Sequence, residues 1–311
     1  MSTRWTTDQI PDQSGRVAIV TGSNSGLGFI AARELARAGA HVVLACRDTE
    51  KGETAARDIE SLSPSGHVQV SSLDLSNLAS VHEFATRLLA EHEGLDLLIN
   101  NAGVMASPRR LTADGFELQL GTNHLGHFAL TALLIEAMIG RDDARVVTVS
   151  SGAHRMGRIN FDDLHGERGY GRWRAYGQSK LANLLFAFEL DRRLRASGSP
   201  VRSIAAHPGY AATNLQSAAA PTADRIFMSI TNRVLAQSAE MGTLPILYAA
   251  THPEVEGGAY IGPGGFMEQR GYPAQVAARP SAYDEGVAAR LWQVSEDLTG
   301  IRFIVPSPTP V

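Results

Sequence analysis

A tyrosine and a lysine four positions apart, Tyr176 and Lys180, lie within a long segment of helical pattern, about Trp173–Ala196. Side chains at positions i and i+4 of a helix project from one face, so these two would be neighbours. A tyrosine hydroxyl has an ordinary pKa near ~10, and a nearby ammonium favours its ionised form. The pair could therefore act as an acid/base group nearer neutral pH. Taken alone, the pattern is common, and most instances are surface pairs.

Polar residues and glycines also follow short apolar segments that are predicted to be strands. The segments that contain them are Asn101-Ala102-Gly103, Ser150-Ser151 and His207-Pro208-Gly209. In an open parallel sheet, ligands bind at the carboxyl ends of the strands. All of these segments would meet at that edge, and chance would not readily place them all there.

A glycine-rich turn, Thr21–Gly28, follows the first predicted strand and precedes a helical segment. Glycines allow a tight turn and a close approach of the backbone to a pyrophosphate, and a helix N-terminus favours the negative charge. The residues expected to bind a dinucleotide are Gly22, Ser23, Asn24, Ser25, Gly26, Leu27 and Gly28. Because the spacing is Gly-x-x-x-Gly-x-Gly and not the commoner Gly-x-Gly-x-x-Gly, the motif alone is weak, and a plain loop is the alternative.

The end of the second predicted strand bears on the choice of cofactor. An acidic side chain there usually holds a free ribose 2′-hydroxyl, but Cys46 stands at that position. Arg47 can pair with a 2′-phosphate, which favours NADP. Asp48 comes one or two positions late, so a register error of one residue would favour NAD instead, and Arg47 would then be a plain surface arginine.

The elements that would position these residues alternate along the chain as short apolar and amphipathic segments. The predicted strands are Arg16–Val20, Val42–Ala45, Val68–Leu73, Leu95–Ile99, Arg145–Val149, Val201–Ala205 and Gly258–Ile261. The predicted helices are Gly26–Ala38, Thr49–Leu62, Asn77–Glu93, Ala113–Leu120, Asn123–Ile139, Trp173–Ala196, Ser238–Ala250 and Tyr283–Glu296. This alternation predicts a doubly wound α/β fold of the Rossmann type, with a mostly parallel seven-stranded sheet and helices on both faces.

No linker or break in composition divides the chain, so we expect one domain over residues 1–311. In such a fold the segment 214–237 would cover the substrate, and residues 262–311 would form a tail. The covering segment contains apolar residues, namely Ile226, Phe227, Met228 and Ile230. They hint at a lipophilic substrate, although an amphipathic helix packed on the body explains them about as well.

Composition excludes several classes of protein. The 311 residues are 44% hydrophobic, which is enough for a large core, and the net charge of −4 with scattered basic residues argues against a nucleic-acid surface. Cys46 is the only cysteine, so no intrachain disulfide is possible. Residues 1–9 have no apolar run, and no stretch reaches ~18 consecutive apolar residues, so we expect no signal peptide, no membrane span and a cytoplasmic location. His124 and His127 have no evident third ligand, so no metal is expected.

Together the motifs resemble the short-chain dehydrogenase/reductase family. The matching segments span most of the chain and are Thr21–Gly28, Asp74, Asn100–Gly103, Asn123, Ser150–Ser151, Tyr176–Lys180 and Pro208–Thr213. The closer resemblance is to the retinol dehydrogenase-like and protochlorophyllide reductase-like branch, through Ala45–Asp48, Thr122–Phe128 and Tyr176–Leu185. Protochlorophyllide reductases are often discussed with active-site cysteines, and the lone Cys46 weakens that function.

The resemblance implies a role for each matched residue. Tyr176 would be the general acid/base, and Lys180 would lower its pKa and hold the cofactor ribose. Ser151 would hydrogen-bond the substrate oxygen, and Asn123 would hold a water that relays protons to Lys180. Further cofactor contacts are implied at the adenine, along the cleft and at the carboxamide, by Asp74, Leu75, Asn101, Ala102, Gly103, Pro208, Gly209 and Thr213.

The choice between Ser150 and Ser151 depends on spacing. Ser151 precedes Tyr176 by 25 positions (176 − 151), about twice the separation in many members of the family. An extra segment near Ile159–Arg172 accounts for the difference and fits the retinol dehydrogenase-like branch, which favours Ser151. The extra segment also adjoins the helix through which many relatives dimerise, so a homo-oligomer stays an open alternative.

The resemblance therefore implies an NADP-dependent enzyme that interconverts a carbonyl and an alcohol on a small molecule. A non-catalytic NADP-binding sensor or scaffold is the first alternative, but it would not need Asn123, Ser151, Tyr176 and Lys180 together. An epimerase or dehydratase that acts on nucleotide sugars can share Tyr-x-x-x-Lys. The glycine spacing and the short C-terminal part argue against it.

Overall fold

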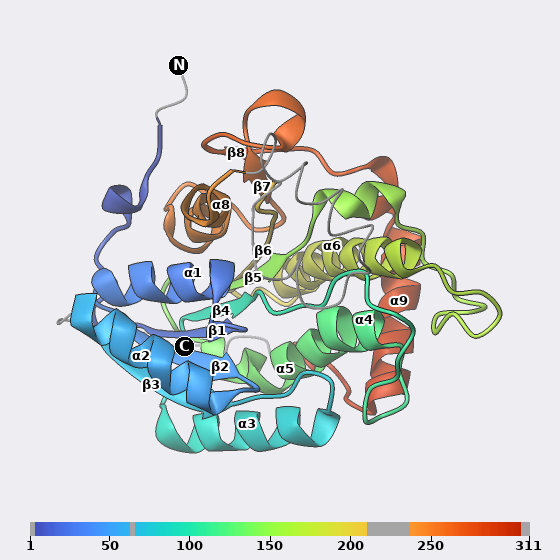
Figure 1. Cartoon of the computed structure of the whole chain (residues 1–311), viewed down its shortest axis with the longest axis horizontal. Helices are drawn as coiled ribbons and strands as arrows, with labels where there is room; N and C mark the ends of the chain where they lie inside the picture. Colours follow the sequence, from blue (N-terminus) through green and yellow to red (C-terminus); the bar gives the residue numbers. More distant parts are fainter. Residues whose placement is uncertain (1–3, 63–65, 210–236, 306–311) are drawn as a thin grey trace.

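The fold is built on one large sheet. A computed structural model of the chain describes residues 4–62, 66–209 and 237–305. The sheet has eight strands in the order β3-β2-β1-β4-β5-β6-β7-β8 (Figure 1). The strands are β1 (Val17–Thr21), β2 (His41–Cys46), β3 (His67–Ser72), β4 (Leu97–Asn100), β5 (Arg145–Val149), β6 (Arg202–Ala206), β7 (Tyr260–Pro263) and β8 (Pro273–Gln275).

The strands from β3 to β7 are all parallel to their neighbours, and β8 pairs antiparallel with β7. The prediction of a doubly wound, mostly parallel sheet is confirmed, but the count of seven strands is wrong. The eighth strand, Pro273–Gln275, lies in the segment that we interpreted as a tail. Three residues are too few to show an alternating pattern, so the sequence did not reveal this strand. Its proline is tolerated because the strand lies at the edge of the sheet.

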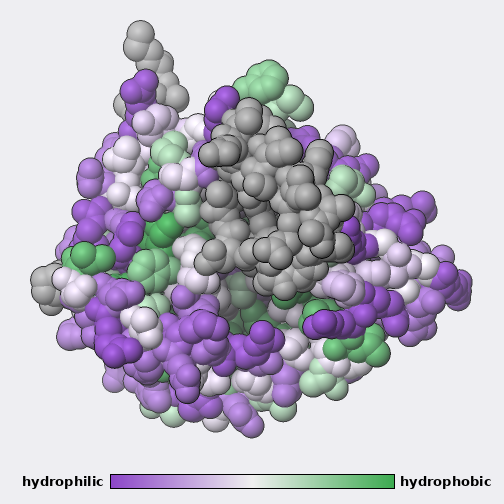
Figure 2. All heavy atoms as spheres, viewed as in Figure 1, coloured by the Kyte–Doolittle hydropathy of each residue, from purple (hydrophilic) through white to green (hydrophobic). Residues whose placement is uncertain are grey.

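Helices cover the sheet on both faces. They are α1 (Gly26–Arg37), α2 (Thr49–Leu62), α3 (Leu78–Glu91), α4 (Leu118–Leu120), α5 (Gly126–Leu134), α6 (Arg172–Ala196), α8 (Ala239–Thr251) and α9 (Glu285–Thr299). In Figure 1, α1 and α8 lie on one side of the strands, and α3 and α5 lie on the other. The outer surfaces of α2 and α3 are mostly hydrophilic in Figure 2, as expected for helices whose apolar faces pack on the sheet.

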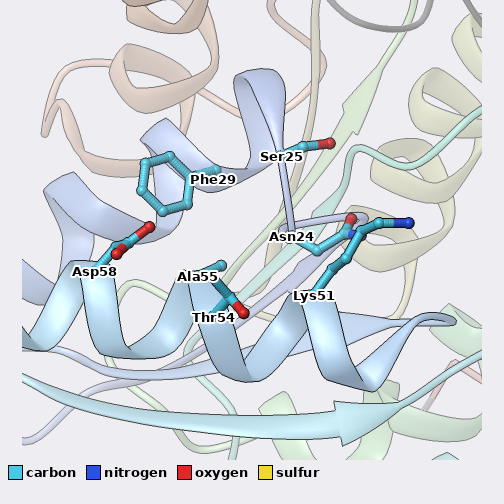
Figure 3. Close-up of a pocket in the computed structure, with 7 residues that line it drawn as sticks. All are labelled: Asn24, Ser25, Phe29, Lys51, Thr54, Ala55 and Asp58. Atoms are coloured by element: carbon cyan, nitrogen blue, oxygen red, sulfur yellow. The ribbon is translucent and has the colours of Figure 1, made fainter.

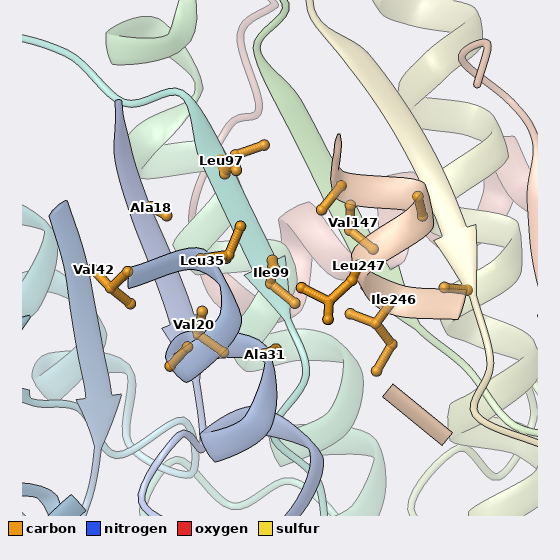
Figure 4. Close-up of a cluster of buried hydrophobic side chains, with 14 of the residues drawn as sticks. Ala18, Val20, Ala31, Leu35, Val42, Leu97, Ile99, Val147, Ile246 and Leu247 are labelled. Atoms are coloured by element: carbon orange, nitrogen blue, oxygen red, sulfur yellow. The ribbon is translucent and has the colours of Figure 1, made fainter. Parts of the chain in front are cut away.

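The two faces of β1 show how the sheet joins two hydrophobic cores. Ala18 and Val20 belong to the cluster formed with α1, α2 and α8, part of which Figure 4 shows. Ile19, between them, belongs to the cluster formed with α3, α5 and α6. Side chains alternate between the faces of a strand, so a strand buried on both faces is apolar at every position. This is why the strands appear in the sequence as continuous apolar runs.

Between β4 and β5, one helix prediction is wrong, and a second is confirmed but with irregular ends. Of the predicted helix Ala113–Leu120, only Leu118–Leu120 is helical, because Thr112 N bonds Phe116 O at 2.8 Å across a turn. The predicted helix Asn123–Ile139 begins as a π-helical turn, Gly121–Leu125, continues as α5 to Leu134 and ends as a 3-10 turn, Ile135–Met138. The apolar periodicity continues through these interruptions, so the pattern alone did not reveal them.

The order of the strands creates a switch point. The chain leaves β1 for β2 and β3 on one side, and β4 then pairs on the other side of β1. Connections therefore diverge at the carboxyl ends of β1 and β4, and ligands of doubly wound sheets bind in the crevice at this point.

Candidate active site

The glycine-rich turn lies directly at the switch point. Gly22 (φ +66°) and Gly26 (φ +59°) adopt left-handed conformations, which favour glycine. A Cβ at Gly28 would lie 2.5 Å from Gly22 O and 2.6 Å from Asn101 Nδ2, so only glycine fits there. Ser25 precedes α1 without a side-chain cap hydrogen bond. The first N–H groups of α1 are therefore available to an anion.

Asn101 and Ala102 hold this turn against β4. Asn101 Nδ2 donates to Thr21 O at 2.8 Å, and the backbone N–H groups of Asn101 and Ala102 both donate to Thr21 Oγ1 at 2.9 Å. A Cβ at Gly22 would lie 3.0 Å from Ala102. The segment 101–103 therefore forms a wall of the cleft, and the Asn101 side chain is engaged in supporting the turn.

The residues after β2 lie beside the turn. Cys46 is buried, and burial raises the pKa of its thiol to about 11, so the thiol is neutral. Asp48 accepts from Lys51 Nζ at 2.6 Å and from Lys51 N at 3.1 Å, which lowers the pKa of its carboxyl group. Arg47, between them, is exposed. Lys51 thus neutralises the negative charge of Asp48, and the positive side chain of Arg47 is open to solvent.

A cavity of about 310 Å³ opens between α1 and α2 next to these residues. Its lining residues are Asn24, Ser25, Phe29, Lys51, Thr54, Ala55 and Asp58 (Figure 3). In this view Asn24 and Lys51 lie at the end of the cavity nearest the glycine-rich turn. The polar end of the cavity therefore adjoins the predicted phosphate site.

The predicted adenine contacts, Asp74 and Leu75, follow β3. Asp74 Oδ1 accepts from Ser76 N at 2.9 Å and from Ser76 Oγ at 2.6 Å, which fixes the turn into α3. Leu75 is buried, and a Cβ at Gly126 would collide with its carbonyl oxygen. Both residues follow the carboxyl end of β3, and their contact with an adenine stays a prediction.

Tyr176 and Lys180 are both buried on α6, facing the carboxyl end of β5. Lys180 Nζ lies 5.9 Å from the centre of the Tyr176 ring and donates to Val149 O at 3.0 Å. Burial lowers the pKa of the Lys180 ammonium to about 8. Burial raises the pKa of the Tyr176 hydroxyl, and a hydrogen bond with the Ser151 side chain partly opposes this. In the protein alone, Tyr176 therefore carries its proton at neutral pH.

The two adjacent serines have different partners. Ser150 Oγ donates to Lys180 O at 2.8 Å and so fastens α6 to the end of β5. Ser151 bonds the Tyr176 side chain, and its Oγ accepts from Ala153 N at 3.2 Å. The structure thus places Ser151, and not Ser150, beside the tyrosine hydroxyl.

Asn123 lies in the π-helical turn on the other side of the cleft. Its Oδ1 accepts from Val104 N at 2.7 Å, and its Nδ2 donates to Val104 O and to Ser179 Oγ, each at 2.9 Å. A Cβ at Gly103 would lie 3.0 Å from Asn123 Oδ1 and 3.6 Å from Lys180 Nζ. Gly103 therefore keeps open the space between these two side chains.

The remaining histidines near the cleft have structural partners. His154 Nδ1 donates to Ser151 O at 2.7 Å, and its Nε2 accepts from Arg279 N at 3.3 Å. His207 Nδ1 accepts from Gly209 N at 3.2 Å. Within residues 4–62, 66–209 and 237–305, no group of three or more His, Cys, Asp or Glu side chains is placed to hold a metal.

Some predicted residues fall outside the described ranges. Thr213 and all of the segment 214–237 except its last residue lie there. Gln237 is described, and it links two loops, since its Nε2 donates to Pro208 O at 2.7 Å and its Oε1 accepts from Gly271 N. The sequence analysis included Thr21, His127 and Gln237 in its segments but did not predict their contacts, because no local motif marks contacts that join distant segments.

Comparison with known proteins identifies the family. The sequence model of the short chain dehydrogenase family matches residues 16–224 of the chain. The chain belongs to the short-chain dehydrogenase family. Its members are NAD(P)-dependent oxidoreductases that act on CH–OH groups, and the chain is an enzyme of this class.

Relatives and solved structures agree with this assignment. This dehydrogenase is 43% identical to human retinol dehydrogenase 13 over 299 residues, covering 92% of this chain and 85% of the relative. An uncharacterized protein from Mycobacterium paratuberculosis has a solved structure at 48% identity and a TM-score of 0.81, covering 97% of this chain and 100% of that one. A protein from Beutenbergia cavernae, assigned as an NAD(P)-dependent gluconate 5-dehydrogenase with NADP at low occupancy, is 28% identical, with a TM-score of 0.61 and coverage of 78% and 92%. In the part of this dehydrogenase that the structure describes, no helix has the length and apolar character needed to cross a bilayer.

Proposed function

We propose that this short-chain dehydrogenase uses NADP(H) to interconvert a carbonyl and an alcohol on an apolar substrate, with Tyr176 as the general acid/base. The observation that carries the proposal is the juxtaposition of Tyr176, Ser151 and Lys180 at the carboxyl edge of the sheet, next to the glycine-rich turn. This arrangement provides a proton donor, a second hydrogen-bonding group and a cation around one point.

The cleft fits a dinucleotide. The close packing around Gly22 and Gly28 and the uncapped start of α1 form a backbone cradle for a pyrophosphate. Asn101–Gly103 would line the cleft, and Pro208 and Gly209 would meet the nicotinamide end. When bound, the cofactor supplies or accepts the hydride.

The residues of the chain move the proton. In the reductive direction, Ser151 and Tyr176 donate hydrogen bonds to the substrate carbonyl oxygen, and the Tyr176 proton passes to that oxygen as the alcohol forms. The Lys180 ammonium stabilises the phenolate that remains, because an adjacent cation favours the charged form of a tyrosine. With a pKa of about 8, Lys180 is mostly protonated at pH 7.

Three features support NADP over NAD. Cys46 offers no charge to a ribose hydroxyl, and the Asp48 carboxylate is bonded twice by Lys51. Arg47 is exposed at the end of β2, where a 2′-phosphate would lie. The Beutenbergia cavernae relative holds NADP, which agrees with this choice.

An aromatic side chain supports an apolar substrate. Trp173 lies one turn before Tyr176 on α6, with the two ring centres 6.2 Å apart and the rings at 77°. Its exposed fraction is 39%, which is high for a tryptophan. An indole beside the reacting hydroxyl would provide an apolar surface for a substrate, and human retinol dehydrogenase 13 is named for an alcohol of that character.

The proposal is tested with a panel of aldehydes, ketones and alcohols of increasing apolar size, by following the NADPH absorbance. Replacing Tyr176 with Phe should abolish turnover and leave NADPH binding nearly intact. Tyr248→Phe on α8, which packs against Trp5 away from the cleft, is the matched control and should keep full activity. Wild-type turnover by Tyr176→Phe would refute the mechanism, and NADPH binding without turnover on any substrate would favour a sensor.

A further inference from the structure

His127 is a buried histidine that contacts both sides of the cleft. It lies in α5, two residues after the π-helical turn, and its exposed fraction is 1%. Its Nδ1 is 3.0 Å from Asn123 O, and its Nε2 is 2.9 Å from Thr21 Oγ1. The imidazole therefore joins the end of β1, which leads into the glycine-rich turn, to the turn that carries Asn123.

The partners determine which nitrogen of His127 carries the proton. A carbonyl oxygen only accepts, so Nδ1 must donate to Asn123 O. Burial lowers the pKa of His127 to about 4, so the ring is neutral and Nε2 can only accept. The single proton of the Thr21 hydroxyl therefore points to Nε2 at 2.9 Å, in preference to Ile99 O at 3.3 Å. Thr21 Oγ1 in turn accepts from the N–H groups of Asn101 and Ala102. The result is one continuous chain of hydrogen bonds from the cleft wall to Asn123.

The backbone around Asn123 departs from regular α-helix. Gly126 N bonds to Gly121 O, five residues back, where an α-helix would use the carbonyl four residues back. Asn123 itself bonds Val104 and Ser179, and Ser179 lies on α6 between Tyr176 and Lys180. The position of Asn123 therefore affects both the cleft wall and the catalytic helix.

We propose that His127 is a positioning residue that holds Asn123 in the π-helical turn through its Nδ1–H, while its Nε2 aligns Thr21. The inference rests on the proposed function, together with the role in proton relay to Lys180 that the family resemblance implies for Asn123. Loss of the Nδ1 bond would leave Asn123 free to move away from Val104 and Ser179. Turnover would then fall more than the affinity for the cofactor, because the glycine-rich turn keeps its own backbone contacts.

His124 provides a matched control. It also has an exposed fraction of 1%, lies three residues earlier in the same segment, and bonds a hydroxyl, that of Ser295 on α9, at 2.9 Å. Burial lowers its pKa to about 3. It faces α9, and its ring packs edge-on against Phe186 of α6. Replacing it measures the cost of removing a buried histidine from this segment while the bond from His127 to Asn123 O is kept.

The test compares kcat, the KM of each substrate and the thermal midpoint for His127→Phe, His127→Asn, His127→Gln and His124→Phe. The Asn amide can still donate to Asn123 O, whereas the Gln side chain reaches towards Thr21. We expect kcat to fall on the order of tenfold in His127→Phe and His127→Gln, to recover within about threefold in His127→Asn, and to be unchanged in His124→Phe. The KM for NADPH should change little in all four.

Equal loss of kcat in His127→Phe and His124→Phe, or equal kcat in His127→Asn and His127→Gln, would overturn the inference. If the Phe variants do not fold, the comparison of the Asn and Gln variants decides the matter. Hydrogen exchange of the amides of residues 121–128 gives a second readout, which should rise in His127→Gln and stay near wild type in His127→Asn. Asn123→Ala separates the two proposals: if it keeps full turnover, the proposed role of Asn123 fails, whatever the His127 variants do.

Discussion

Raising the pH above about 8 should slow carbonyl reduction, because Lys180 then loses its proton. Burial lowers the pKa of this ammonium from 10.5 to about 8. Roughly nine tenths of the lysine is therefore charged at pH 7 and about one tenth at pH 9. Burial raises the pKa of Tyr176, so the tyrosine keeps its own proton through this range. The rate should consequently fall about tenfold for each pH unit above the lysine pKa.

The assay is the kcat/KM of NADPH-dependent reduction between about pH 6 and 10, since this ratio reports the pKa values of the free enzyme. Lys180→Arg is the informative variant, because a guanidinium keeps its charge throughout the range. The variant should be less active, since a guanidinium differs in shape from an ammonium. The descending limb of its pH profile should move above pH 10. A wild-type profile that is flat to pH 10, or the same limb in Lys180→Arg, would refute this account of the pair.

Three further changes probe the cofactor cleft and the substrate surface. Gly28→Ala should abolish NADPH binding, because the new methyl would lie 2.5 Å from Gly22 O and 2.6 Å from Asn101 Nδ2. Retained affinity in a fluorescence titration would contradict the proposed cradle. Arg47→Ala should lower the affinity for NADPH about tenfold and that for NADH little, since the exposed guanidinium would make a partly screened contact with the 2′-phosphate. Equal effects on the two affinities would argue against this contact. Trp173→Ala should raise the KM of large apolar substrates several-fold and leave short aldehydes unaffected, and a uniform change would remove the proposed apolar surface.

The sequence predicted the layers of the fold well, because strands buried on both faces appear as apolar runs between amphipathic helices. It also predicted that Tyr176 and Lys180 would be neighbours, since helix geometry alone brings positions i and i+4 together. The strand Pro273–Gln275 was missed because three edge residues form no pattern. The π-helical turn at Gly121–Leu125 was missed because it keeps the apolar periodicity of the helix around it.

Contacts between distant segments could not be predicted from the sequence either. Spacing alone favoured Ser151 over Ser150, but only the folded chain shows that Ser150 points to the backbone of α6 and Ser151 to the Tyr176 side chain. His127 bonds Thr21, which is 106 positions away in the chain. No local pattern encodes such a partner, so the histidine could be read only as a buried residue or as half of a metal site.

The order of the strands affects how the chain folds while it is being synthesised. Strands β1 to β4 form a contiguous half of the sheet whose last member, Leu97–Asn100, is buried at every residue. Its other neighbour, β5, begins only at Arg145. On the ribosome, β4 would therefore remain an open, apolar edge until those residues emerge, and such edges readily pair with other chains. Nascent chains that stop between these two strands should be aggregation-prone, and β5, which is also buried at every residue, should present the same kind of edge until β6 emerges at Arg202.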